Sequence, residues 1–100
     1  MILRLALSLL LTCVACSSAF ADPPLKALII EGQNNHGVWP KTTKMMKRYL
    51  EESKLFAVDV ATTAKNGTDP EFKPEFKKYN VVVSNYNGAA WPEETKKAFL

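Results

Sequence analysis

Apolar residues along this chain gather into three short runs, and each run ends in a polar loop. The runs at Ala27–Ile30 and Val81–Ser84 are apolar without alternation, which is typical of strands that are buried on both faces. The run Phe56–Thr62 alternates larger apolar residues with small or polar ones, and this pattern fits a strand nearer the edge of a sheet. We therefore expect three strands at these positions.

Between the first two runs the apolar spacing changes to that of a helix, which we expect from Lys41 to Ser53. Pro40 suits the first turn, because the N–H that proline lacks would be unpaired there. One apolar stripe should face the sheet, and it consists of Met45, Met46, Tyr49 and Leu50. A further helix should start at Pro92–Glu94, because acidic side chains complement the positive end of a helix.

The resulting order is strand, helix, strand, short helix, strand, helix. This alternation predicts an α/β fold with a parallel sheet and helices on both faces, and right-handed crossovers give the flavodoxin-like strand order 2-1-3. Pro70–Tyr79 should form a loop with a turn or two of helix, with Phe72 and Phe76 under the sheet. The third strand keeps an unpaired edge, so we expect residues 22–100 to be the N-terminal part of a larger domain.

The first 21 residues have the pattern of a secretory signal peptide. Arg4 precedes an apolar run from Leu5 to Ala15, which is shorter than the roughly 20 residues that a membrane-spanning helix needs. Ala19–Ala21 is an A-x-A cleavage signal, so we expect an exported protein without a transmembrane segment after cleavage. Lipidation at Cys16 is the alternative, since a small residue precedes that cysteine.

Charge and motif content argue against several classes of function. Without Arg4 the chain has 12 basic and 10 acidic side chains, and they are mixed along the sequence. No stretch interleaves arginine with aromatic residues, so we expect no nucleic-acid partner. The sequence also lacks G-x-G-x-x-G, the P-loop motif and the G-x-S-x-G elbow, which argues against nucleotide-phosphate cradles and α/β-hydrolase chemistry.

Candidate binding residues lie in the loops after the first and third strands. These strands should be neighbours, and ligands of parallel α/β sheets bind at the carboxyl ends of the strands. Amides pair with hydroxyl groups and aromatic faces cover sugar rings, so the two loops suit a carbohydrate. The candidate residues are Gln33, Asn34, Asn35, Trp39, Asn85, Tyr86 and Asn87. The alternative is that these asparagines simply form turns.

His36, the single histidine of the chain, lies in the first of these loops. Its imidazole is a candidate catalytic base or a candidate ligand of a divalent metal. A zinc site would need further ligands at suitable spacing, which the sequence does not show. An ordinary loop histidine is the alternative.

Three groups of residues occur together in this chain. They are Gly32-Gln33-Asn34-Asn35-His36 with Trp39, Phe56-x-Val58-Asp59-Val60, and Asn85-Tyr86-Asn87-Gly88 with Trp91-Pro92-Glu93-Glu94. This combination resembles the ThuA-like (trehalose utilisation) family over nearly all of residues 22–100. The resemblance implies a flavodoxin-like fold related to class I glutamine amidotransferases, whose catalytic triad ThuA-like domains generally lack.

The resemblance also implies a role in sugar catabolism, particularly of oxidised (3-keto) disaccharides. His36 matches the loop histidine of the family, but Gly37 and Val38 stand where an acidic or polar residue commonly follows. This departure argues against His36 being part of a metal site or an acid–base pair. Further residues of the family's site would lie beyond Leu100. We expect an exported protein that binds or processes a carbohydrate. The alternatives are a non-catalytic sugar-binding or interaction module, and an amidotransferase-like hydrolase with its nucleophile beyond Leu100.

Overall fold

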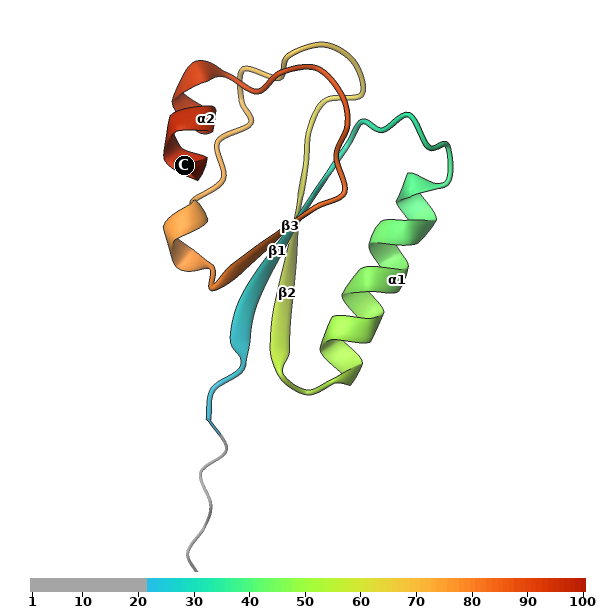
Figure 1. Cartoon of the computed structure of the whole chain (residues 1–100), viewed down its shortest axis with the longest axis vertical. Coiled ribbons are helices and arrows are strands. Elements are labelled where there is room, and N and C mark those ends of the chain that lie inside the picture. Colours follow the sequence, from blue (N-terminus) through green and yellow to red (C-terminus); the bar gives the residue numbers. More distant parts are fainter. Residues whose placement is uncertain (1–21) are drawn as a thin grey trace, which may run out of the picture.

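The computed structural model describes residues 22–100 and shows a parallel three-stranded sheet in the order β2-β1-β3 (Figure 1). The central strand β1 (Leu25–Glu31) pairs with β2 (Phe56–Thr62) on one side and with β3 (Val81–Ser84) on the other. The predicted fold class and strand order are therefore confirmed. The signal-peptide and lipidation predictions concern residues 1–21, which lie outside the described part of the chain.

The central strand carries the core of the domain. Its apolar run is buried throughout, with Ala27 and Ile29 in one hydrophobic cluster and Leu28 and Ile30 in another. Two clusters form because successive side chains of a strand point to opposite faces of the sheet. The strand β2 lies at the edge of the sheet as expected and has Val58 as its single buried side chain, whereas Val60, on the same face, is 37% exposed. Hydrophobic burial on both faces of β1 is thus the main source of stability.

One face of the sheet is covered by α1 (Trp39–Glu52) (Figure 1). This helix begins two residues before the predicted start and ends one residue before the predicted end, with Pro40 in its first turn as expected. It has 14 residues. Within residues 22–100, no helix has the length and apolar character needed to cross a membrane.

The buried stripe of α1 differs from the predicted one. Thr43 is buried, and Met46 and Leu50 pack against the cluster around Ala27. Met45 and Tyr49 were expected on the same stripe, but they are 47% and 53% exposed. Residues three or four positions apart line up along a helix, whereas adjacent residues lie about 100° apart around its axis. The helix therefore contacts the sheet through Met46 and Leu50. The residues just before them in the sequence, Met45 and Tyr49, lie on the side of the helix and stay exposed.

The opposite face is covered by the connection between β2 and β3 and by α2 (Glu93–Phe99) (Figure 1). Phe72 is buried against Leu28 and Ile30, and Phe76 packs against the same cluster from the short 3-10 helix η1 (Phe76–Lys78). Both phenylalanines thus lie under the sheet as predicted. Helical segments cover both faces.

Trp91 lies at the centre of an aromatic cluster on this face. Its ring centroid is 5.3 Å from that of Phe72, 5.5 Å from that of Phe99 and 5.8 Å from that of Tyr86. Within the described residues its buried Nε1 has no hydrogen-bond partner. The Thr95 hydroxyl donates a hydrogen bond of 2.6 Å to the Phe72 carbonyl and so fastens α2 to the cluster.

A hydrogen bond between side chains joins the loop before β3 to β2. The Tyr79 hydroxyl donates to Asp59 Oδ2 over 2.8 Å. This bond, together with burial and the negative charges of Asp59 and Glu75, raises the pKa of Tyr79 above its usual value of 10.0. The folded state therefore holds the phenol proton more tightly than the unfolded chain does. The resulting stability is fully present below the unfolded pKa and is lost as the pH rises through the folded pKa.

We expect Tyr79→Phe to lower the free energy of unfolding near neutral pH by about 0.5–1 kcal/mol, because one exposed hydrogen bond is lost. The variant should also lose less stability than the parent protein as the pH is raised through about 10 and above. Urea unfolding at both pH values measures the two effects. Tyr49→Phe is the matched control, since the Tyr49 hydroxyl makes no hydrogen bond within residues 22–100. Equal pH dependence in the two variants would contradict the role of Asp59.

Candidate functional site

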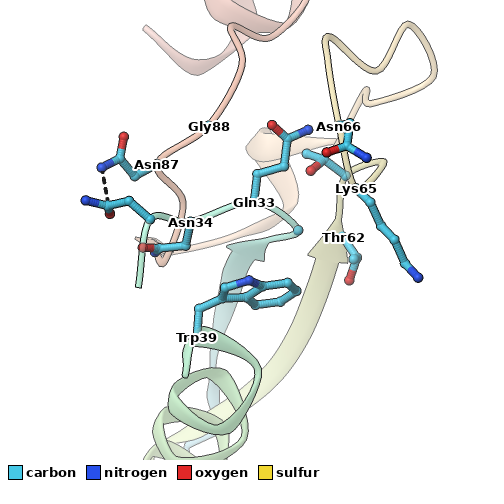
Figure 2. Close-up of a pocket in the computed structure, with 11 residues that line it drawn as sticks. Gln33, Asn34, Trp39, Thr62, Lys65, Asn66, Asn87 and Gly88 are labelled. Atoms are coloured by element: carbon cyan, nitrogen blue, oxygen red, sulfur yellow. Dashed lines mark hydrogen bonds between the residues drawn. The ribbon is translucent and has the colours of Figure 1, made fainter. Parts of the chain in front are cut away.

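Three loops meet at the carboxyl ends of the three strands and line an open cavity of ≈ 580 Å³ (Figure 2). This is the edge of the sheet where parallel α/β folds bind ligands. The residues around the cavity come from the loops after β1, β2 and β3 and from the start of α1. They are Gly32, Gln33, Asn34, Asn35, Trp39, Thr62, Thr63, Lys65, Asn66, Asn87 and Gly88.

Gln33 cross-links the three loops through its side-chain amide. Its Nε2 donates to the carbonyls of Ala64 and Gly67 over 2.8 and 2.9 Å, and both belong to the loop after β2. Its Oε1 accepts from the N–H of Ala89, in the loop after β3, over 2.9 Å. Both amide hydrogens are therefore used within the protein. Gln33 lines the cavity, but its amide group holds the three loops together.

Two glycines allow the loops to approach this closely. Gly32 has φ +130, and a Cβ atom there would lie 2.6 Å from the backbone nitrogen of Thr63. A Cβ atom on Gly88 would overlap the side chain of Gln33. The first position also has a backbone conformation that favours glycine. Any larger residue at either position would push two loops apart.

Asn85 and Tyr86, which we predicted as ligand contacts, do not line the cavity. Asn85 Nδ2 donates to the Trp39 carbonyl over 3.1 Å and to Thr43 Oγ1 over 2.9 Å, so it fastens the end of β3 to the first turn of α1. The Tyr86 hydroxyl donates to the Ala89 carbonyl over 2.6 Å, and its ring packs against Trp91. Both side chains thus hold the elements that carry the cavity.

The remaining predicted contacts do lie at the cavity. Asn34 lines it but is partly engaged, since its Oδ1 accepts from the His36 N–H over 2.9 Å. Asn87 Nδ2 donates to Asn35 Oδ1 over 3.0 Å, which leaves Asn35 Nδ2 and Asn87 Oδ1 without partners within residues 22–100. Figure 2 shows the half-buried Trp39 indole reaching from the start of α1 toward Thr62. The arrangement offers an aromatic face, a free donor and a free acceptor.

The loop after β2 contributes lining residues that sequence reasoning missed, namely Thr62, Thr63, Lys65 and Asn66. The turn formed by Asn66-Gly67 is visible in the sequence, but it carries no sign of a ligand. The useful signal was the strand order itself. Because β2 is adjacent to β1, the loops after these two strands must also be adjacent.

His36 is exposed and is not among the residues that line the cavity. Its backbone is fixed, because its N–H donates to Asn34 and its carbonyl accepts from the Trp39 N–H over 3.0 Å. In the part of the chain from residue 22 onward, no three His, Cys, Asp or Glu side chains are grouped to hold a metal ion. A catalytic role for His36 stays a prediction.

Comparison with known proteins yields one solved structure, described as a ThuA-like protein from Parabacteroides merdae ATCC 43184. The two chains share 42% sequence identity with a TM-score of 0.73, and the match covers 77% of this chain. This chain spans 28% of the length of that protein. No family model matches the chain, and a search of curated proteins gives no significant match. The structural match supports the resemblance to the ThuA-like family and the flavodoxin-like fold.

We expect Gln33→Ala to lower the free energy of unfolding by about 1–3 kcal/mol, because three backbone groups lose their partner. Amide hydrogen exchange should speed up at Ala89 and in residues 64–67. Urea unfolding and exchange mass spectrometry measure these effects. Asn66→Ala is the matched control, since its amide makes no hydrogen bond within the described residues. If both variants lose equal stability, Gln33 does not hold the loops together.

Proposed function

We propose that this chain is the N-terminal part of a ThuA-like domain in the glutamine amidotransferase-like superfamily, and that the domain binds a carbohydrate between its three loops. The observation that carries the proposal is the cavity at the carboxyl ends of the strands, which is lined by side-chain amides and an indole. Its volume of ≈ 580 Å³ falls in the usual range for small-molecule pockets.

The chemistry of the lining supports a sugar in particular. The Trp39 ring offers an apolar face of the kind that packs against the C–H side of a sugar ring. The free amide groups of Asn35 and Asn87 add one donor and one acceptor for hydroxyl groups. The similar ThuA-like protein gives the proposal its family context.

The proposal extends to localisation and substrate. The leader pattern of residues 1–21 supports export to the periplasm or the extracellular space, with lipidation at Cys16 as the alternative route. The family resemblance supports an oxidised (3-keto) disaccharide as the substrate.

Trp39→Ala should weaken binding of a disaccharide such as trehalose or its 3-keto form by about tenfold or more, because the stacking surface is lost. Isothermal titration calorimetry with the full-length protein measures this change. Tyr49→Ala is the matched control, since Tyr49 is an exposed aromatic residue of the same helix outside the cavity. Undiminished binding by Trp39→Ala, or an equal loss in both variants, would overturn the placement of the sugar.

The catalytic form of the proposal makes His36 a base or a metal ligand that acts on the bound sugar next to its keto group. The position of His36 outside the lining favours the second candidate function, a non-catalytic sugar-binding module. The two forms differ in turnover but share the binding site.

If His36 acts in catalysis, His36→Ala should abolish turnover of a 3-keto-disaccharide by the full-length protein. Binding of the same sugar should change by less than about twofold, because the exposed imidazole contributes no lining surface. Product chromatography and calorimetry measure the two quantities. Saturable binding with no product from the unmodified protein would establish the non-catalytic form, and unchanged turnover in the variant would remove His36 from the mechanism.

A further inference from the structure

Lys65 is the single charged side chain among the residues that line the cavity. It projects from the loop after β2 and is exposed, and Figure 2 shows its side chain running past Thr62 on the side away from Trp39. No aspartate or glutamate lines the cavity. The lining therefore carries a net positive charge.

The charge of Lys65 is not neutralised within the described residues. Four other lysines pair with glutamates, namely Lys47, Lys73, Lys78 and Lys96, whereas Lys65 makes no ion pair there. Asp69 belongs to the same loop, but its two carboxylate oxygens accept backbone N–H groups of Ala64 and Glu71 over 2.8 and 2.9 Å. That carboxylate shapes the loop while the ammonium group stays available.

The uncharged groups of the lining add hydrogen-bond donors for the same ligand. Asn35 Nδ2 and Trp39 Nε1 are donors without partners within residues 22–100, whereas the Gln33 carbonyl oxygen already accepts from Ala89. Asn87 Oδ1 and the Asn66 amide add acceptors, so it is the charge of Lys65 that favours an anion, to which hydrogen bonds from a charged donor are strongest.

We propose that the carbohydrate bound here carries a carboxylate, as uronic and aldonic acids do, and that Lys65 pairs with it. This inference rests on the proposed function and adds the class of sugar. A carboxylate fits better than a phosphate ester, because the lining holds one cation and no arginine. The Trp39 ring would hold the sugar while Lys65 selects its acidic group.

The test is calorimetric titration of the full-length protein with glucose, glucuronate and glucose 6-phosphate at low ionic strength. Glucuronate should bind about fivefold or more tightly than glucose, and the preference should shrink as salt is added. Lys65→Gln should weaken glucuronate binding more than glucose binding and so reduce the preference to below about twofold, whereas Lys65→Arg should keep the preference. Lys44→Gln is the matched control, because Lys44 is an exposed lysine of α1 outside the cavity.

The other outcomes separate the two proposals. Equal binding of glucose and glucuronate, or a preference that survives Lys65→Gln, would overturn this inference while leaving carbohydrate binding in place. Tighter binding of glucose 6-phosphate than of glucuronate would overturn the assignment of a carboxylate. Binding of none of these sugars, nor of trehalose or its 3-keto form, would overturn the proposed function together with this inference.

Discussion

The candidate site depends on the hydrogen bonds that the side-chain amide of Gln33 makes to two other loops. This amide joins backbone groups that lie 31, 34 and 56 residues away along the chain. A loop lacks the regular ladder of hydrogen bonds that joins a strand to its neighbours, so hydrogen bonds from other segments help to fix its shape. Here one residue supplies such bonds to two loops at once, and Gly88 leaves the space that its side chain needs, while Gly32 lets the first loop approach Thr63. The cavity exists because these three loops are held as a unit.

The amides of this region divide into two kinds. Gln33 and Asn85 use their amides inside the protein, where they hold loops and fasten β3 to α1. Asn35 and Asn87 bond to each other and still keep one free polar atom each at the cavity. Rigid support of this sort preorganises the free groups, which lowers the entropy lost when a ligand binds.

The strands could be predicted from the sequence because buried positions of a strand must be apolar, and this requirement produces a recognisable run or alternation of apolar residues. The strands β2 and β3 begin and end where the pattern places them, and Phe72 lies under the sheet as expected. Side-chain roles within one loop were harder to predict, because Asn85 and Asn87 look alike in sequence and differ only in direction. Lys65 was missed for a related reason, since a lysine in a polar loop gives no sign of which cavity it borders.

The two tryptophans occupy opposite environments, and this gives the protein two separate optical reporters. Trp39 stands half-buried at the cavity, where a bound molecule would change its fluorescence and shield it from quenchers. Trp91 is packed among aromatic rings with its ring nitrogen buried, so its signal follows the integrity of the face that α2 covers. Occupancy of the cavity and melting of the core can therefore be followed in one sample without any added label.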